Sequence, residues 1–242
     1  MRLALAFLYA TTMNIYGDRG NVMALRQRCA WRGIDLDVAS IGLGDPLEAG
    51  RFDLFFFGGG QDKEQIAVAD DLQGVKGATL KQELLGGAPG LAVCGGYQLL
   101  GHYYQPHGAP RLPGIGFFDV VSEAGHERFI GNVVVDSPEF GALVGFENHS
   151  GLTRLGPGVR PLGRVRIGRG NNGRDGTEGA RCQNVIGCYL HGAFLPKNPT
   201  VADFLIAAAV ERRYGRQALA ALDDRLEATA HASALGRAAR TR

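Results

Sequence analysis

The chain has 242 residues, of which 45% are hydrophobic and 21% charged, and its formal net charge is +2. This composition is typical of a globular protein with one core, near the upper end of the usual domain range of about 50–250 residues. A charge of +2 does not indicate nucleic-acid binding, and no run approaches the roughly 20 apolar residues of a membrane span. The four cysteines lack C-x-x-C spacing, so we predict no metal site and expect a cytoplasmic protein with reduced thiols.

The first hundred residues alternate short apolar runs with helical patterns. The first run lacks a clear cleavage site, so it is interpreted as a buried strand rather than a signal peptide. We predict strands at 3–10, 35–41, 53–59 and 91–96, a helix over Asn21–Arg32 with Asp18 as its N-cap, and a helix over 62–86. This alternation indicates a parallel sheet covered on both faces, which binds ligands at the carboxyl ends of its strands.

The second half changes character, because apolar runs from about 115 to 190 are short and separated by Gly, Pro and Asn. They predict antiparallel strands and hairpins, with an exposed loop at 168–179. Helical periodicity returns at 199–227 and is followed by an Ala- and Arg-rich tail. We therefore predict a three-layer α/β fold with a mostly parallel central sheet, helices on both faces, and antiparallel strands in the second half. A single domain would span 1–227, and 228–242 would be a flexible tail.

The stretch 90-GLAVCGGYQLLG-101 places Cys94 at the joint between a predicted strand and a predicted helix. A lone cysteine at a strand end is most often a small buried hydrophobe. Here the pattern G-x-x-x-C-G-G-x-Q favours a nucleophile elbow, a sharp turn that lifts the reactive side chain clear of the sheet. The N-terminus of the following helix stabilises negative charge and hence the thiolate, which is the attacking species. We therefore favour a catalytic role for Cys94.

A cysteine nucleophile needs a base, which is normally a histidine. The chain contains six histidines: His102, His107, His126, His149, His191 and His231. His191 follows the apolar run NVIGCYL and is expected at the same carboxyl edge as Cys94. His149, in 147-ENHSG-151, also lies near a predicted strand end. Spacing favours His191 but leaves both open.

Three further features belong to the same candidate site. The triple glycine in 53-DLFFFGGGQD-62 is either a flexible loop or part of an oxyanion hole, in which its backbone N–H joins that of Gly95. Gln98 lies four residues after Cys94 on the same helix face, where it could hold a polar substrate or only satisfy a loop. Arg128 is an ordinary surface residue unless the substrate carries a carboxylate, which a guanidinium binds well.

Taken in order, the motifs NIYGDRGN, FFFGGGQD, AVCGGYQLLG, GFENHSG and YLHGAFLPKNP resemble the class I glutamine amidotransferases of the cobyric-acid-synthase-like branch. The resemblance spans about residues 1–210 and is greatest to the glutaminase subunits of lipid II isoglutaminyl synthase. It implies a flavodoxin-like fold and an enzyme that hydrolyses L-glutamine through a Cys94 thioester, with His191 as base and acid. It also implies oxyanion-hole donors at Gly60 and Gly95, and glutamine contacts by four residues: Arg128, Gln98, Asn148 and His149.

The resemblance further implies a heterodimer that acts in peptidoglycan biosynthesis. Ammonia would pass to a MurT-like Mur-ligase subunit, which amidates the D-glutamate α-carboxylate of lipid II at the inner face of the membrane. ATP and Mg²⁺ are expected in that partner, and no cofactor is expected in this chain. The alternatives are a cobyric-acid-type subunit with another acceptor, a stand-alone cysteine hydrolase, and a dead binding subunit. The last predicts loss of the Cys or His, and both are present.

One position departs from the family pattern. Class I enzymes commonly carry a glutamate two residues after the catalytic histidine, where this chain has Ala193. Either a Cys–His dyad suffices or a carboxylate comes from the partner subunit. We expect the second, so that the isolated chain would be a poor glutaminase that its partner activates. A stand-alone hydrolase would need a complete triad in this chain, which the sequence does not reveal.

Overall fold

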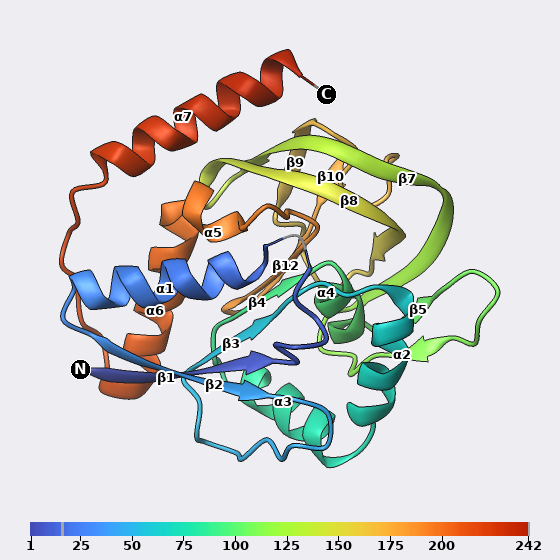
Figure 1. The fold of residues 1–242 in the computed structure, drawn as a ribbon, viewed down its shortest axis with the longest axis horizontal. Helices are drawn as coiled ribbons and strands as arrows, with labels where there is room; N and C mark the ends of the chain where they lie inside the picture. Colours follow the sequence, from blue (N-terminus) through green and yellow to red (C-terminus); the bar gives the residue numbers. More distant parts are fainter. Residues whose placement is uncertain (16, 242) are drawn as a thin grey trace.

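A computed structural model describes residues 1–15 and 17–241, in which two β-sheets lie together with helices packed around them (Figure 1). Residue 16, inside the NIYGDRGN motif, and residue 242, the last of the predicted tail, lie outside the described residues. Within the described part of the chain, no helix is both long enough and apolar enough to cross a membrane.

The first sheet carries the strand ends at which a ligand would bind. Its strand order is β11-β12-β4-β3-β1-β2, and every pair is parallel except β11 with β12. The strands are β1 Arg2–Leu8, β2 Asp35–Ile41, β3 Leu54–Phe57, β4 Gly90–Val93, β11 Ala180–Cys182 and β12 Val185–Cys188. All residues of β3 and β4 are buried, as strands covered on both faces require. The predicted parallel sheet is confirmed.

Helices cover both faces of this sheet. They are α1 Arg19–Trp31, α2 Asp62–Asp71, α3 Val75–Leu85, α4 Gly95–Leu100, α5 Phe194–Lys197 and α6 Pro199–Tyr214. The predicted single helix over 62–86 is wrong, because the chain breaks between α2 and α3 at Gly74, whose φ of +106° disfavours other residues. The helix predicted over 199–227 ends early, since α6 stops before Gly215 at φ +79°.

The second sheet consists largely of antiparallel strands, as predicted. Its order is β10-β9-β7-β5-β6, and β8 pairs with β7. The strands are β5 Tyr103–Gln105, β6 Leu112–Pro113, β7 Val120–Ser137, β8 Gly141–Leu155, β9 Gly163–Ile167 and β10 Thr177–Glu178. Strand β7 is longer than the short strands that the sequence predicts for this region. Its register to β8 shifts between Ala124 and Phe129.

Two predictions for the second half are corrected. The run NVIGCYL was grouped with the antiparallel strands, but its strand β12 joins the first sheet and pairs in parallel with β4. The loop 168–179 is not exposed throughout, because Asn171 and Glu178 are buried within it. The Asn171 side chain bonds the Gly179 backbone in both directions, so this loop is folded back against the sheets.

In place of an irregular tail, residues 225–240 form helix α7, Arg225–Arg240, which runs along the outside of the second sheet (Figure 1). A small apolar contact holds its C-terminal half: Ala238 is buried against Val134 of β7 and Val144 of β8. Ala234 and Leu235 extend this contact, and together with Ala238 they form a short apolar face.

A buried arginine ties the helices together. The Arg28 side chain in α1 is 3% exposed, and its guanidinium bonds both carboxylate oxygens of Asp203 in α6, at 2.6 and 2.7 Å. It also bonds both oxygens of Asp224, just before α7, at 2.8 and 2.9 Å. Two bidentate carboxylate contacts satisfy this buried cation, which therefore fixes α6 and the start of α7 against α1.

We predict that Arg28→Ala lowers the free energy of unfolding by about 2 kcal/mol, since both carboxylates lose a bidentate charged contact while Asp203 keeps its bond to Arg32. Urea unfolding followed by circular dichroism measures the loss. Arg26→Ala on the exposed side of the same helix is the matched control and should leave the midpoint unchanged. Equal midpoints for the two variants would contradict the role given to Arg28.

Candidate active site

Cys94 occupies the predicted sharp turn between β4 and α4. Its backbone has φ +52° and ψ −108°, a strained conformation that a non-glycine residue adopts only when its surroundings impose it. The Cys94 N–H donates to the Cys188 carbonyl of β12 at 2.8 Å, which anchors the turn to the neighbouring strand. An added Cβ at Gly96 would lie 2.6 Å from the Phe57 carbonyl oxygen, so the turn packs against β3 only with glycine there.

His191 lies three residues beyond β12, and the parallel pairing of β12 with β4 brings it to the same sheet edge as Cys94. Its side chain is 0% exposed, and its backbone exchanges two hydrogen bonds with Phe146 of β8, at 2.8 and 3.2 Å. The histidine is thus held by both sheets. Of the two candidates left open by the sequence, His191 is the one placed beside Cys94.

Asp18 supplies a carboxylate to this histidine from within the chain. Its Oδ1 lies 3.3 Å from His191 Nδ1, and its Oδ2 accepts the Gly59 N–H at 2.7 Å. Asp18 is the N-cap residue of α1, as predicted, but its carboxylate makes no capping bond to the helix. The usual glutamate is absent, because position 193 is alanine. The carboxylate that we expected from a partner subunit is instead supplied by Asp18 of this chain.

The electrostatics of His191 follow from these neighbours. Burial alone lowers the pKa of His191, but the hydrogen bonds to Asp18 and Cys94 outweigh burial and raise it to about 10. The imidazole is therefore protonated at neutral pH. A protonated histidine beside a cysteine favours the thiolate, which is the reactive form of the side chain.

Gly59 lies in the middle of these three residues. An ideal Cβ on Gly59 would stand 3.0 Å from His191 Cε1, 3.2 Å from Cys94 Cβ and 3.3 Å from Asp18 Oδ2. Bare backbone at this position is what lets the three side chains approach one another. The triple glycine is therefore a packing requirement as well as a candidate oxyanion loop.

The two predicted oxyanion donors, Gly60 and Gly95, are also closely packed. An added Cβ would lie 2.1 Å from Met13 Sδ at Gly60 and 2.8 Å from Gln65 Nε2 at Gly95. Neither N–H has an acceptor among the described residues, and that of Gly95 lies in the first turn of α4, where helices leave N–H groups unpaired.

Six of the eight predicted site residues line one pocket of 430 Å³, a size typical of small-molecule sites. They are Cys94, Gly60, Gln98, Arg128, Asn148 and His149. His191 and Gly95 do not line the pocket, but both adjoin Cys94. Sequence reasoning missed other lining residues, among them Gln65, Asp62 and Lys63. Asp62 and Lys63 belong to the GGGQDK stretch, in which the sequence analysis assigns a role to the glycines only.

The polar groups of this pocket suit a zwitterion. Arg128 donates from Nε to Asn148 Oδ1 at 2.7 Å, and Lys63 adds a second cation. Asp62 brings a carboxylate, which accepts the Tyr104 hydroxyl at 3.2 Å. Among residues 1–15 and 17–241, no group of three or more His, Cys, Asp or Glu side chains is placed to hold a metal ion.

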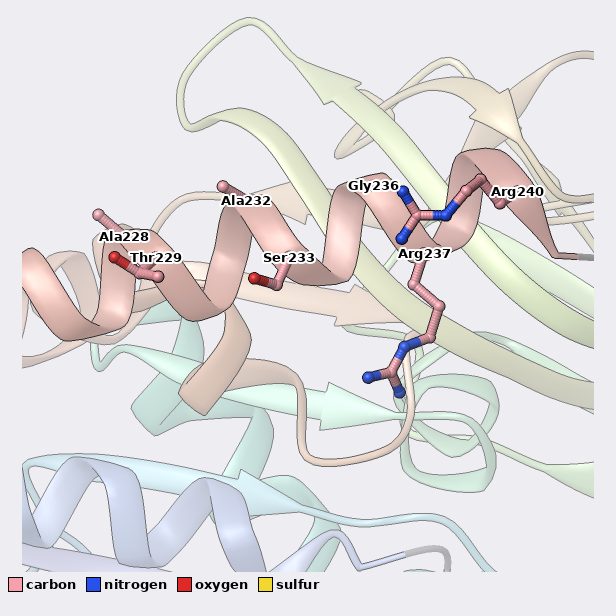
Figure 2. A pocket seen from close by; sticks show the side chains of 7 residues that line it. All are labelled: Ala228, Thr229, Ala232, Ser233, Gly236, Arg237 and Arg240. Atoms are coloured by element: carbon pink, nitrogen blue, oxygen red, sulfur yellow. The ribbon is translucent and has the colours of Figure 1, made fainter.

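A larger hollow of 740 Å³ lies along α7 (Figure 2). It offers small side chains and two guanidinium groups but no cysteine, histidine or carboxylate. Its lining residues are Ala228, Thr229, Ala232, Ser233, Gly236, Arg237 and Arg240. The chemistry therefore belongs to the pocket at Cys94.

Comparison with known proteins agrees with this geometry. Residues 4–199 match the CobB/CobQ-like glutamine amidotransferase domain, and the chain belongs to that family. A solved structure described as a glutamine amidotransferase superposes with a TM-score of 0.56 at 16% identity, covering 84% of this chain and 98% of its own, which supports the fold. The chain is thus a glutamine amidotransferase, as the sequence motifs predict.

Two relatives narrow the resemblance. The GatD subunit of the glutamine-hydrolysing lipid II isoglutaminyl synthase of Staphylococcus aureus is 42% identical over 201 residues, which cover 83% of this chain and 82% of the relative. The same subunit from Streptococcus pneumoniae is 37% identical over 217 residues, covering 89% and 83%. The predicted resemblance to GatD, the glutaminase subunit, is confirmed.

We predict that Gly59→Ala lowers ammonia release from glutamine about 10²-fold, because its Cβ would push His191 and Cys94 apart and small displacements at a reacting centre are costly. Gly90→Ala in β4 is the matched control, since all contacts of its added Cβ are 3.5 Å and ordinary. The ammonia assay is run on both variants after their melting temperatures are compared. Full activity of a folded Gly59→Ala variant would contradict the packing described here.

Proposed function

We propose that this chain is the glutaminase subunit of a lipid II isoglutaminyl synthase and that it hydrolyses L-glutamine through a thioester on Cys94. The observation that carries the proposal is the approach of Cys94, His191 and Asp18 beside one small polar pocket. The acceptor rests on the names of the two GatD relatives.

The first half of the reaction forms the thioester. The Cys94 thiolate attacks the side-chain amide carbon of glutamine, and the N–H groups of Gly60 and Gly95 receive the oxyanion of the tetrahedral intermediate. His191, protonated next to Asp18 and Cys94, gives its proton to the leaving nitrogen. The C–N bond breaks, ammonia departs, and a γ-glutamyl thioester remains on Cys94.

The second half regenerates the enzyme. His191, now neutral, accepts a proton from water as the water attacks the thioester carbon. Collapse of the second tetrahedral intermediate expels the Cys94 thiolate and releases glutamate. The sum is glutamine plus water giving glutamate plus ammonia. Asp18 holds one imidazole nitrogen throughout, which fixes the ring and stabilises its charged form.

Substrate binding follows from the charges at the pocket mouth. Arg128 would pair with the α-carboxylate of glutamine while Asn148, which Arg128 already contacts, adds an amide nearby. Gln98 and His149 lie deeper in the same pocket. The ammonia would then pass to a MurT-like Mur-ligase partner, which holds ATP and Mg²⁺ and converts the D-glutamate of lipid II to D-isoglutamine.

The carboxylate of Asp18 also favours a second candidate, a cysteine hydrolase that works without a partner. The sequence argument against it was the lack of a complete triad, and Asp18 supplies the third member. The two candidates differ in one observable, which is whether glutamine hydrolysis depends on a second subunit. They share the Cys94 chemistry.

The test of the proposal is ammonia release from L-glutamine by wild type and Cys94→Ala, alone and with the co-expressed Mur-ligase-like subunit. We expect Cys94→Ala to lose at least about 10³-fold of the activity, because the covalent step disappears. Amidation of lipid II should need both subunits. Full activity in Cys94→Ala would refute the mechanism, and hydrolysis that ignores the partner would favour the stand-alone hydrolase.

Asp18→Asn should lower ammonia release about 10²–10⁴-fold, since Asn keeps the shape and the Gly59 contact but not the charge. The wild-type pKa of His191 is raised, so its charged form persists at low pH and is lost as pH rises toward about 10. Without the Asp18 charge, that loss moves to lower pH. A pH–rate profile of both proteins checks the shift, and identical alkaline limbs would contradict it.

A further inference from the structure

Three buried acceptor atoms in the glutamine pocket have no hydrogen-bond partner within the described residues. One is Oε1 of Gln65, whose amide nitrogen bonds the Gly60 carbonyl in the glycine loop. The other two are Oε1 of Gln98 and Nε2 of His149, both from side chains that are 3% exposed and both lining the pocket with Cys94. An unsatisfied buried polar atom costs free energy, so its retention points to a ligand that completes it. The missing partner must bring N–H or O–H donors.

One residue outside the pocket lining holds both groups in this orientation. The Tyr189 hydroxyl accepts from Gln98 Nε2 at 3.0 Å, which turns the Gln98 oxygen away from it. The Tyr189 ring stacks on His149, with centroids 3.6 Å apart and planes 7° from parallel. Gly151 provides the space for the Gln98 amide, because an added Cβ at Gly151 would lie 2.2 Å from Gln98 Nε2.

A buried chain of hydroxyls continues from Tyr189. Because Gln98 donates to the Tyr189 oxygen, the Tyr189 proton is left for Thr153 Oγ1 at 2.7 Å, which in turn bonds Ser122 Oγ at 2.7 Å. Burial raises the pKa of Tyr189, so its phenol keeps the proton that it donates.

His149 presents a lone pair for a related reason. Burial is the main cause that lowers the pKa of His149 to about 3, so the ring is neutral. Its Nδ1 lies 2.8 Å from the Gly151 carbonyl oxygen and must be the protonated nitrogen, which leaves Nε2 as an acceptor.

We propose that Tyr189 is a positioning residue that aims Gln98 Oε1 and His149 Nε2 at the α-ammonium group of the substrate. An ammonium has three donors and no acceptor, which matches a site of lone pairs. The amide end of glutamine is committed to Cys94 and the glycine N–H groups, so these acceptors serve the other end. Arg128, which takes the carboxylate, lines the same pocket as Gln98 and His149, so one α-carbon could present its two charged substituents to both groups. The inference rests on the proposed glutaminase function and adds a demand for a free α-amino group.

The test compares two substrates in the complex with the partner subunit: L-glutamine and 4-carbamoylbutanoate, which lacks the α-ammonium. Wild type should prefer glutamine by about 10²-fold in kcat/KM, and Tyr189→Phe should lose about tenfold on glutamine, mainly through KM, because a charged hydrogen bond is weakened. Tyr189→Phe should lose nothing on the desamino substrate. Tyr97→Phe is the matched control, since this buried tyrosine packs against Tyr189 and donates to Asn171 instead.

Each outcome decides a different point. Equal losses on both substrates, or a wild type that does not distinguish them, would overturn the role given to Tyr189. No ammonia from glutamine in wild type would instead overturn the proposed function. If Tyr189→Phe does not fold, Thr153→Val removes the acceptor of the Tyr189 proton and carries the test with the same two outcomes.

Discussion

The site depends on the parallel pairing of β12 with β4. These strands are separated by nearly a hundred residues, yet their register places Cys188 opposite Val93. Both strands therefore end at the same edge of the sheet. Cys94 then turns into α4, and His191 follows after two buried residues. The hydrogen bond from the Cys94 N–H to the Cys188 carbonyl holds the ends of the two strands together. Without this pairing, no arrangement of local motifs would bring the thiol and the imidazole into contact.

Around that edge, the chain uses glycine wherever a side chain would occupy space that the reaction needs. Gly59 has no side chain that would keep Asp18, Cys94 and His191 apart. Gly96 likewise lets the turn at Cys94 pack against β3. Such close packing limits solvent access, and burial strengthens the ion pair of His191 with Asp18. The strained backbone of Cys94 persists because these contacts determine it from several sides. Reactivity and packing are therefore parts of one arrangement.

The sequence predicted the parallel sheet and the elbow because each has a local pattern, whereas the glutamine contacts were predicted from the family resemblance. Apolar runs indicate buried strands, and C-G-G after such a run indicates a turn. Asp18 was predicted only as the N-cap of a helix, because its side-chain partner, His191, is remote in sequence and approaches it only through the fold. Tyr189 was read as part of an apolar run, since nothing local shows that its hydroxyl meets Gln98. Helix α7 escaped prediction because its apolar face is short, consisting of Ala234, Leu235 and Ala238 near its C-terminal end.

The central claim is that Cys94 is the nucleophile and that its neighbours make it more reactive than the other thiols. A diazoketone analogue of glutamine, followed by peptide mass mapping, tests this directly. The chain carries its own comparison, because Cys29 and Cys188 are buried and do not line the pocket, and Cys182 is half-buried on β11. We predict one adduct, on Cys94, that excess glutamine prevents and that Asp18→Asn slows. Modification of another cysteine, or labelling of Cys94 that glutamine does not prevent, would contradict the account.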